Sequence, residues 1–136
     1  MIKQIITDTN FLSKKAVLAT KDDLSVVTDL QDTLKENAYR GVGLAANMIG
    51  VNKRIIVVQI GPMEFPMVNP TITAKSDSYE AEEGCLSLLG KRKATRYQRI
   101  TVSYVDKNFK SHLDTFTGFT AQIIQHEVDH CEGILI

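Results

Sequence analysis

The sequence lacks the features that mark membrane, secreted and nucleic-acid-binding proteins. Sixteen basic residues balance sixteen acidic ones, and a net charge of zero favours neither nucleic acid nor an acidic membrane surface as a partner. No apolar run approaches the roughly 20 residues that a membrane-spanning helix needs. The N-terminal residues also lack the sustained apolar core of a signal peptide. We therefore expect a cytoplasmic protein with no nucleic-acid or membrane partner.

Cysteine and histidine are scarce, with two cysteines and three histidines among 136 residues. The two cysteines are far apart in the sequence, and together they could form at most one disulfide. An apolar fraction of 43% and a charged fraction of 24% are ordinary for a globular protein. The length, without internal repeats or linkers, predicts a single domain over residues 1–136.

Two of the three histidines stand four residues apart, with Glu127 directly after the first of them. Residues four apart lie on one face of an α-helix, about 5–6 Å between Cβ atoms. His126 and His130 can therefore bind one metal ion at about 2.0–2.1 Å. Glu127 adjoins that face and can act as a general base, as in an H-E-x-x-H motif. A pair of satisfied core histidines is the alternative, and the shared spacing around a glutamate favours the metal site.

A third metal ligand has to come from elsewhere in the chain, because a catalytic site of this kind usually has three protein ligands and one open position. His126, His130 and Gly133 fit the protease pattern H-E-x-x-H-x-x-G-x-x-H, but its final position is Ile136, which cannot bind a metal. Glu132 lies two residues beyond His130 and points away from the histidine pair. We therefore expect an upstream ligand, which argues against the common metalloproteases.

The two cysteines have different surroundings. Cys131 continues an apolar stripe with Ile124 and Val128, which predicts a buried core thiol. Cys85 follows Gly84 in a polar segment, where glycine lets backbone approach a ligand closely. A Cys85 thiolate, two imidazoles and a water would complete a four-coordinate site. An inert, half-buried thiol is the alternative for Cys85, and the metal role suits it better than a disulfide.

The hydrophobic pattern predicts an α+β fold with a mainly antiparallel sheet. Apolar residues three and four positions apart predict a helix from Asp22 or Asp23 to about Tyr39. A second helix over residues 118–132, capped by Thr117 and ended by Gly133, would carry the histidines. Strands are expected at residues 54–60, 67–74, 100–105 and 110–116, with Pro70 suited to an edge or bulge.

The remaining segments carry weaker signals. Residues 1–20 look extended and irregular. The glycine- and alanine-rich segment 41–50 indicates a tightly packed turn, because its G-x-G lacks the preceding strand and third glycine of a dinucleotide-binding loop. His112 lies among polar residues and is predicted to be a solvated surface residue rather than a metal ligand.

Three segments together resemble the three motifs of peptide deformylases: Gly41–Met48, Glu83–Ser87 and Gln125–His130. The resemblance implies an α+β fold, with antiparallel sheets packed around a central C-terminal helix that carries H-E-x-x-H, plus an N-terminal helix. It implies hydrolysis of the formyl group from the N-terminal formylmethionine of bacterial polypeptides. Nascent N-formylmethionyl chains are the expected partners, with the ribosome as the expected place of action.

The resemblance also implies roles for individual residues. Cys85, His126 and His130 would hold one divalent ion, Fe²⁺ in typical members and replaceable by Zn²⁺, Ni²⁺ or Co²⁺. Glu127 matches the catalytic glutamate, and the Leu86 backbone N–H would help to hold the oxyanion. Other matched positions are the cleft-lining residues Val42, Gly43 and Gly84 and the basic residues Arg92 and Arg96.

Met48 is the main departure from the family pattern, which has a glutamine at this position. That glutamine donates a hydrogen bond to the oxygen that becomes negative during attack, and a thioether has no proton to donate. Losing one such donor typically lowers kcat by about 10²–10³-fold. The side chain of Asn47 is expected to point elsewhere and not to replace it. We therefore expect a deformylase with weakened activity.

A non-enzymatic protein is the competing hypothesis. It would keep the site to bind metal and formylated or other small peptides, without significant turnover. Met48 favours this reading, whereas the retained base Glu127 favours chemistry, since a binding protein has no use for it.

Overall fold

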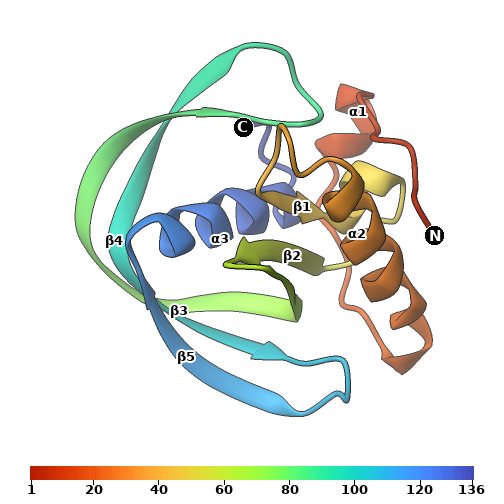
Figure 1. Ribbon diagram of the computed structural model, residues 1–136. Helices are drawn as coiled ribbons and strands as arrows, with labels where there is room; N and C mark the ends of the chain where they lie inside the picture. The colour runs from red at the N-terminus through yellow and green to blue at the C-terminus, as the bar shows by residue number, and fades with distance from the viewer.

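The computed structural model describes residues 1–136 and shows one antiparallel sheet bent around a C-terminal helix (Figure 1). The five strands follow the order β1-β2-β3-β4-β5, so each strand pairs with its neighbour in sequence. This confirms the predicted α+β class, with all the strands in a single sheet. The strands are β1 (Gly43–Ala45), β2 (Ile55–Ile60), β3 (Met63–Gly84), β4 (Lys91–Val105) and β5 (Ser111–Thr117).

Two long helices complete the fold. Helix α3 (Gly118–Cys131) ends one residue before the predicted boundary, and Thr117 is its N-cap residue, although the Thr117 side chain makes no capping hydrogen bond. Helix α2 (Ser25–Glu36) begins later and ends earlier than predicted. At its start the chain first forms the 3-10 helix η1 (Lys21–Asp23), which Thr20 caps. At its end the Asn37 side-chain amide donates to the Thr33 carbonyl, where it competes with the backbone N–H groups that would continue the helix. None of the helices has the length and apolarity needed to cross a membrane.

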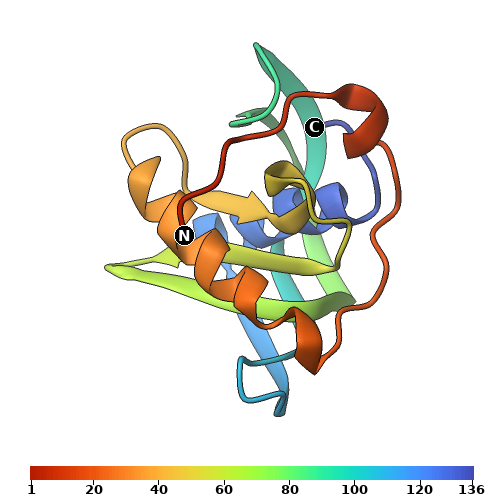
Figure 2. The same ribbon diagram turned by 90° about the vertical axis from the view of Figure 1, so that its right-hand side faces the viewer.

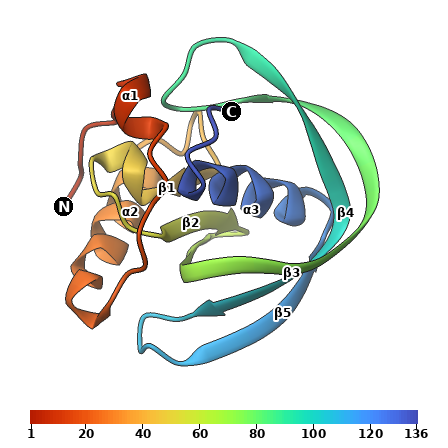
Figure 3. The ribbon, with the colours of Figure 1, turned by 180° about the vertical axis from the view of Figure 1, so that it is seen from behind.

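Strands β3 and β4 are much longer than the apolar runs that predicted them. Residues 75–84 and 91–99 are mostly polar and lack a buried run, yet they pair in continuous register from Lys75↔Ile100 to Gly84↔Lys91. Opposite charges face each other across this pairing, as in Glu82↔Lys93, which favours it. The register shifts between Val68 and Thr71, which places an irregularity at Pro70 as expected. The two strands form a long arm that arches past α3 (Figure 3).

Helix α3 is the centre of the molecule, because the sheet curves around it. Nine of its 14 residues are buried, so it contributes both apolar core residues and functional side chains to the interior. Ile124 is fully buried, and Cys131 is buried as predicted, with 1% of its surface exposed. Both cysteines are free thiols. The polar residues that α3 carries inward are therefore withdrawn from solvent.

The N-terminal segment and α2 cover the opposite side of the sheet (Figure 2). Val27, Leu30 and Leu34 form the buried face of α2. The first 20 residues are mostly extended, as predicted, but include the short helix α1 (Thr9–Leu12), which Asp8 caps by accepting from the Asn10 N–H. Backbone hydrogen bonds join this segment to Met48 and to Cys131 at the end of α3. The segment thereby ties the helix terminus to the 3-10 helix η2 (Ala46–Ile49).

Asn69 fastens the N-terminal segment to the sheet, which leads to a stability prediction. Its side chain accepts from the Ala19 N–H at 2.8 Å and donates to the Ala19 carbonyl at 3.0 Å, and its φ is 52°. Asn69→Gly keeps the backbone conformation but loses both bonds, which should lower the free energy of unfolding by about 1–3 kcal/mol. Asn69→Ala should lose about 1 kcal/mol more, because alanine disfavours positive φ. Urea unfolding measures both, and equal stability of the three proteins would contradict the prediction.

Candidate metal centre

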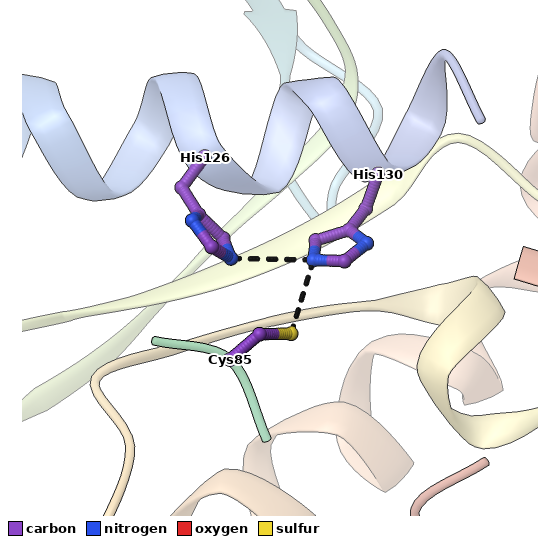
Figure 4. A group of neighbouring side chains, drawn as sticks. All are labelled: Cys85, His126 and His130. Carbon is purple, nitrogen blue, oxygen red and sulfur yellow. Dashed lines mark hydrogen bonds between the residues drawn. The ribbon is translucent and has the colours of Figure 1, made fainter. Parts of the chain in front are cut away.

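Cys85 and the two histidines of α3 converge on one point (Figure 4). The Cys85 Sγ lies 3.2 Å from the His130 Nε2, which lies 3.2 Å from the His126 Nε2. All three ligand atoms lie within 4.8 Å of one another. An ion with tetrahedral bonds of about 2.0–2.3 Å places its nitrogen and sulfur ligands about 3.3–3.6 Å apart. The donor set therefore fits one divalent ion with small adjustments.

The chain positions these ligands from two elements. His126 and His130 stand four apart on the buried face of α3, as the motif predicts. Cys85 directly follows β3, in the connection from β3 to β4. The Ser87 backbone N–H donates to the Cys85 Sγ at 3.4 Å, which helps to hold the sulfur in place. The sulfur therefore reaches the histidine pair from the tip of the β3–β4 arm.

Glu83 orients His126, a role that the sequence analysis missed. The Glu83 carboxylate lies 2.9 Å from the His126 Nδ1, which favours a proton on Nδ1 and directs Nε2 toward the metal site. Arg96 donates to both oxygens of Glu83 at 2.9 and 2.7 Å, and Gln122 donates at 2.9 Å. Burial opposes ionisation, but the hydrogen bonds from His126, Arg96 and Gln122 lower the pKa of Glu83 to about 2. The sequence feature that could have indicated this role is the position of Glu83, an acidic residue two positions before Cys85.

The two histidines have different electrostatic surroundings. Burial and the charge of His126 lower the pKa of His130 to about 3, so its ring is neutral. Burial opposes protonation of His126 too, but hydrogen bonds with Cys85 and Glu83 outweigh it and raise its pKa to about 10. A metal ion that binds His126 therefore has to displace a proton there.

Replacing Glu83 should weaken metal binding while leaving the three ligands in place. Glu83→Gln removes the charged acceptor behind His126, and loss of such an outer partner typically costs about 10–100-fold in affinity. Competition with a chromophoric chelator measures the Kd for Co²⁺. Glu80→Gln is the matched control, because Glu80 is exposed on the same strand and its side chain accepts a hydrogen bond from the Thr95 hydroxyl at 2.7 Å. Equal Kd values for Glu83→Gln and the unchanged protein would refute the role.

Glu127 lies beside the ligands with an unpartnered carboxyl group. It is 4% exposed, and its Oε1 has no hydrogen-bond partner. A Cβ atom added at Gly43 would lie 2.6 Å from the Glu127 Oε2, so glycine there makes room for the carboxyl group. Burial raises the pKa of Glu127 to about 7. A carboxyl group with a pKa near neutrality is suited to take up a proton and release it again.

A cavity of about 650 Å³ opens onto Glu127 and the ligands, a volume in the usual range of small-ligand sites. Val42, Gly43 and Gly84, predicted from the sequence to line a cleft, all border it. Arg92 does not border it, and Arg96 lies in the Glu83 network instead. The apolar part of the lining comes from Val42, Met48, Leu86, Leu88, Leu89, Phe119 and Ile123.

Met48 also borders this cavity but offers it no hydrogen-bond donor. It is 1% exposed, and its sulfur accepts from the Ala45 N–H at 3.4 Å. The neighbouring Asn47 points elsewhere, as expected, since its Nδ2 donates to the His130 carbonyl at 3.0 Å. The Asn47 amide is therefore engaged outside the cavity.

Two residues that the sequence analysis set aside lie outside the metal centre. His112 is exposed, pairs with Asp106 at 2.7 Å and stacks on Tyr104, so it remains on the surface as predicted. Glu132 pairs with Arg54 at 2.6 Å and with Lys15, away from the histidines. Neither competes with Cys85 as the third ligand.

Comparisons with known proteins agree with this arrangement. The model of the polypeptide deformylase family matches residues 2–136. A peptide deformylase from Clostridium beijerinckii is 56% identical over the full length of both chains. One from Syntrophomonas wolfei is 34% identical, over 98% of this chain and 90% of the relative.

Solved structures give the same result. The Met-Ala-Ser-bound class I type b peptide deformylase from Acinetobacter baumannii superposes with a TM-score of 0.89 at 30% identity, over 99% of this chain and 97% of that one. The enzyme from Thermotoga maritima superposes with the same TM-score at 29% identity, over 99% and 95%. The chain therefore belongs to the peptide deformylase family, whose members are metal-dependent hydrolases that act on the N-formyl amide.

Proposed function

We propose that this chain hydrolyses the formyl group of N-formylmethionyl peptides in the cavity beside Glu127, with one divalent ion held by Cys85, His126 and His130. The observation that carries the proposal is the buried, unpartnered Glu127 carboxyl group next to three converging ligand atoms. A buried carboxyl group without a partner is costly unless it serves a reacting group. Its position in the lining of the cavity supports a base that meets water and substrate there.

Proton transfer in the reaction falls to Glu127. A divalent ion in such a site supplies a Lewis acid that lets water lose a proton near neutral pH. Glu127 takes that proton as the water oxygen attacks the formyl carbon. It then delivers the proton to the amine nitrogen as the C–N bond breaks, which yields formate and a free N-terminus. We assign the Leu86 backbone N–H as a donor to the developing oxyanion, whereas Met48 can donate nothing.

The cavity supports a peptide as the substrate. The related Acinetobacter baumannii enzyme is described with Met-Ala-Ser bound. We propose that a formylated peptide of this type lies along Gly43 and Gly84, where the absence of side chains lets two backbones approach. The methionine side chain would contact apolar residues such as Val42 and Leu86, both of which border the cavity.

We further propose Fe²⁺ as the native ion, with Zn²⁺, Ni²⁺ or Co²⁺ able to replace it, because a Cys-His-His set suits several of these metals. Residues 1–136 would act as a single domain. The expected substrates are nascent N-formylmethionyl polypeptides in the cytoplasm, met at the ribosome. Crosslinking of the protein to ribosomes that carry formylated nascent chains would test the last point.

A second candidate function is peptide binding without significant turnover. Met48 favours it, since a donor that typically contributes 10²–10³-fold in kcat is missing. Glu127 opposes it. The two functions differ in turnover and not in metal or peptide binding, so a kinetic experiment separates them.

The deciding experiment is turnover of formyl-Met-Ala-Ser on protein prepared anaerobically with iron, with metal content measured on the same preparation. Formate release at one ion per chain, abolished by a chelator and restored by iron, supports the deformylase. Metal and peptide binding without formate release supports the binding protein. Chelator-sensitive digestion of casein would instead indicate a metalloprotease and contradict both.

A further inference from the structure

We propose that Asn47 is a positioning residue for His130. It orients this histidine through atoms that face away from the metal site, as Glu83 orients His126 through its Nδ1. The inference rests on the proposed function, because it concerns how one of the proposed metal ligands is oriented. It links the segment before β2 directly to the helix that carries the histidines.

The contact between the two residues is buried and long-range. Asn47 lies in η2 and is 1% exposed, and His130 is fully buried in the last turn of α3. The Asn47 Nδ2 donates to the His130 carbonyl at 3.0 Å. The same carbonyl accepts from the Gly133 backbone N–H at 3.0 Å, so the Asn47 amide is its second donor and ties the end of α3 to η2 at the residue that carries the ligand.

Two further atoms of the same pair are buried without partners, namely the His130 Nδ1 and the Asn47 Oδ1. The His130 Nε2 faces Cys85 and His126, and the second ring nitrogen points away from both (Figure 4). When Nε2 offers its lone pair to a metal, Nδ1 carries the proton and is a donor. The Asn47 Oδ1 is an acceptor.

One arrangement satisfies both atoms. The Asn47 Oδ1 receives the His130 Nδ1–H through one buried water, or directly after a small shift of the two side chains, while Nδ2 keeps the His130 carbonyl. Metal-binding histidines almost always donate their second N–H to such a partner, which fixes the ring. The two histidines then differ in the charge of the residue that orients them, because His126 has a charged partner and His130 has a neutral one.

The experiment uses Co²⁺ as the probe and compares the unchanged protein with Asn47→Ala and Asn37→Ala. Asn37 is the matched control: it is another nearly buried asparagine whose Nδ2 donates to a helix carbonyl, that of Thr33 at 2.8 Å, in α2. Competition with a chelator gives the Kd. Proton NMR of the Co²⁺ protein gives the exchangeable, paramagnetically shifted imidazole N–H resonances of the two histidines.

We expect Asn47→Ala to weaken Co²⁺ binding by about 10-fold or more and to expose one of the two N–H resonances to rapid solvent exchange. Asn37→Ala should leave the Kd and both resonances unchanged. Asn47→Asp keeps an acceptor of the same size but loses the N–H that binds the His130 carbonyl, so slow exchange of the affected resonance in this variant identifies Oδ1 as the acceptor. This variant also serves if Asn47→Ala does not fold.

Two outcomes separate this inference from the proposed function. If the unchanged protein does not bind one equivalent of Co²⁺, the proposed metal site fails. If it binds Co²⁺ normally and Asn47→Ala leaves both the Kd and the N–H resonances unaltered, Asn47 does not position His130.

Discussion

Replacing Glu127 by glutamine is expected to lower kcat by about 10²–10⁴-fold, the usual contribution of a positioned general acid–base. Glutamine has nearly the same shape, so Gly43 still leaves room for it. It cannot take a proton from water, however, and it cannot return one to the leaving amine. The metal ligands on either side are untouched, so the variant should bind one ion per chain, with KM changed much less than kcat.

Formate release and metal content on the same preparation check this result. Glu36→Gln is a suitable control, since Glu36 is exposed at the end of α2 and does not line the cavity. Loss of metal together with activity would instead mean that Glu127 supports the site's structure. Unchanged kcat would rule out Glu127 as the base.

Replacing Met48 by glutamine is expected to raise kcat/KM at least tenfold, and up to about 10³-fold if a full oxyanion donor is restored. The Met48 sulfur already accepts from the Ala45 N–H. A glutamine Oε1 can accept from the same group, which leaves its Nε2 free to donate into the cavity. The gain should fall mainly on kcat, because the donor is needed where negative charge develops.

Met48→Leu is the matched control for this gain. Leucine is also apolar and fills a similar volume, so it should leave kcat/KM close to that of the unchanged protein. A gain in both variants would point to packing rather than hydrogen bonding. No gain in Met48→Gln would show that this position does not limit the reaction.

The parts of the fold that carry an apolar pattern could be predicted from the sequence. Strand β2, the buried part of β4 and helix α3 follow their hydrophobic periodicity closely. The outer halves of β3 and β4 could not be predicted in this way, since their polar residues form strands only because each pairs with the other. The sequence predicts a turn where the structure has strand β1. This short strand forms because its three residues pair with Val58, Val57 and Ile56 across a long loop, and a local pattern does not reveal such a pairing.

The same division applies to the candidate site. The spacing of His126 and His130 is local to one helix, so the sequence reveals it. The position of Cys85 beside them follows from elimination and family resemblance, and the structure brings the three together. Glu83 and Asn47 could not be assigned, because their contacts with the histidines join segments 43 and 83 residues apart.

The long β3–β4 arm has a consequence for how metal binding affects the whole molecule. Cys85 lies at the tip of this arm, and the histidines lie on the central helix. A bound ion would therefore connect the tip of the arm to the helix. Closure of the arm and metal occupancy are then thermodynamically linked, and each favours the other. A chelator would thus do more than stop turnover, because it would remove one link between the arm and the helix and leave polar contacts such as those of Glu83 and Arg96 with α3.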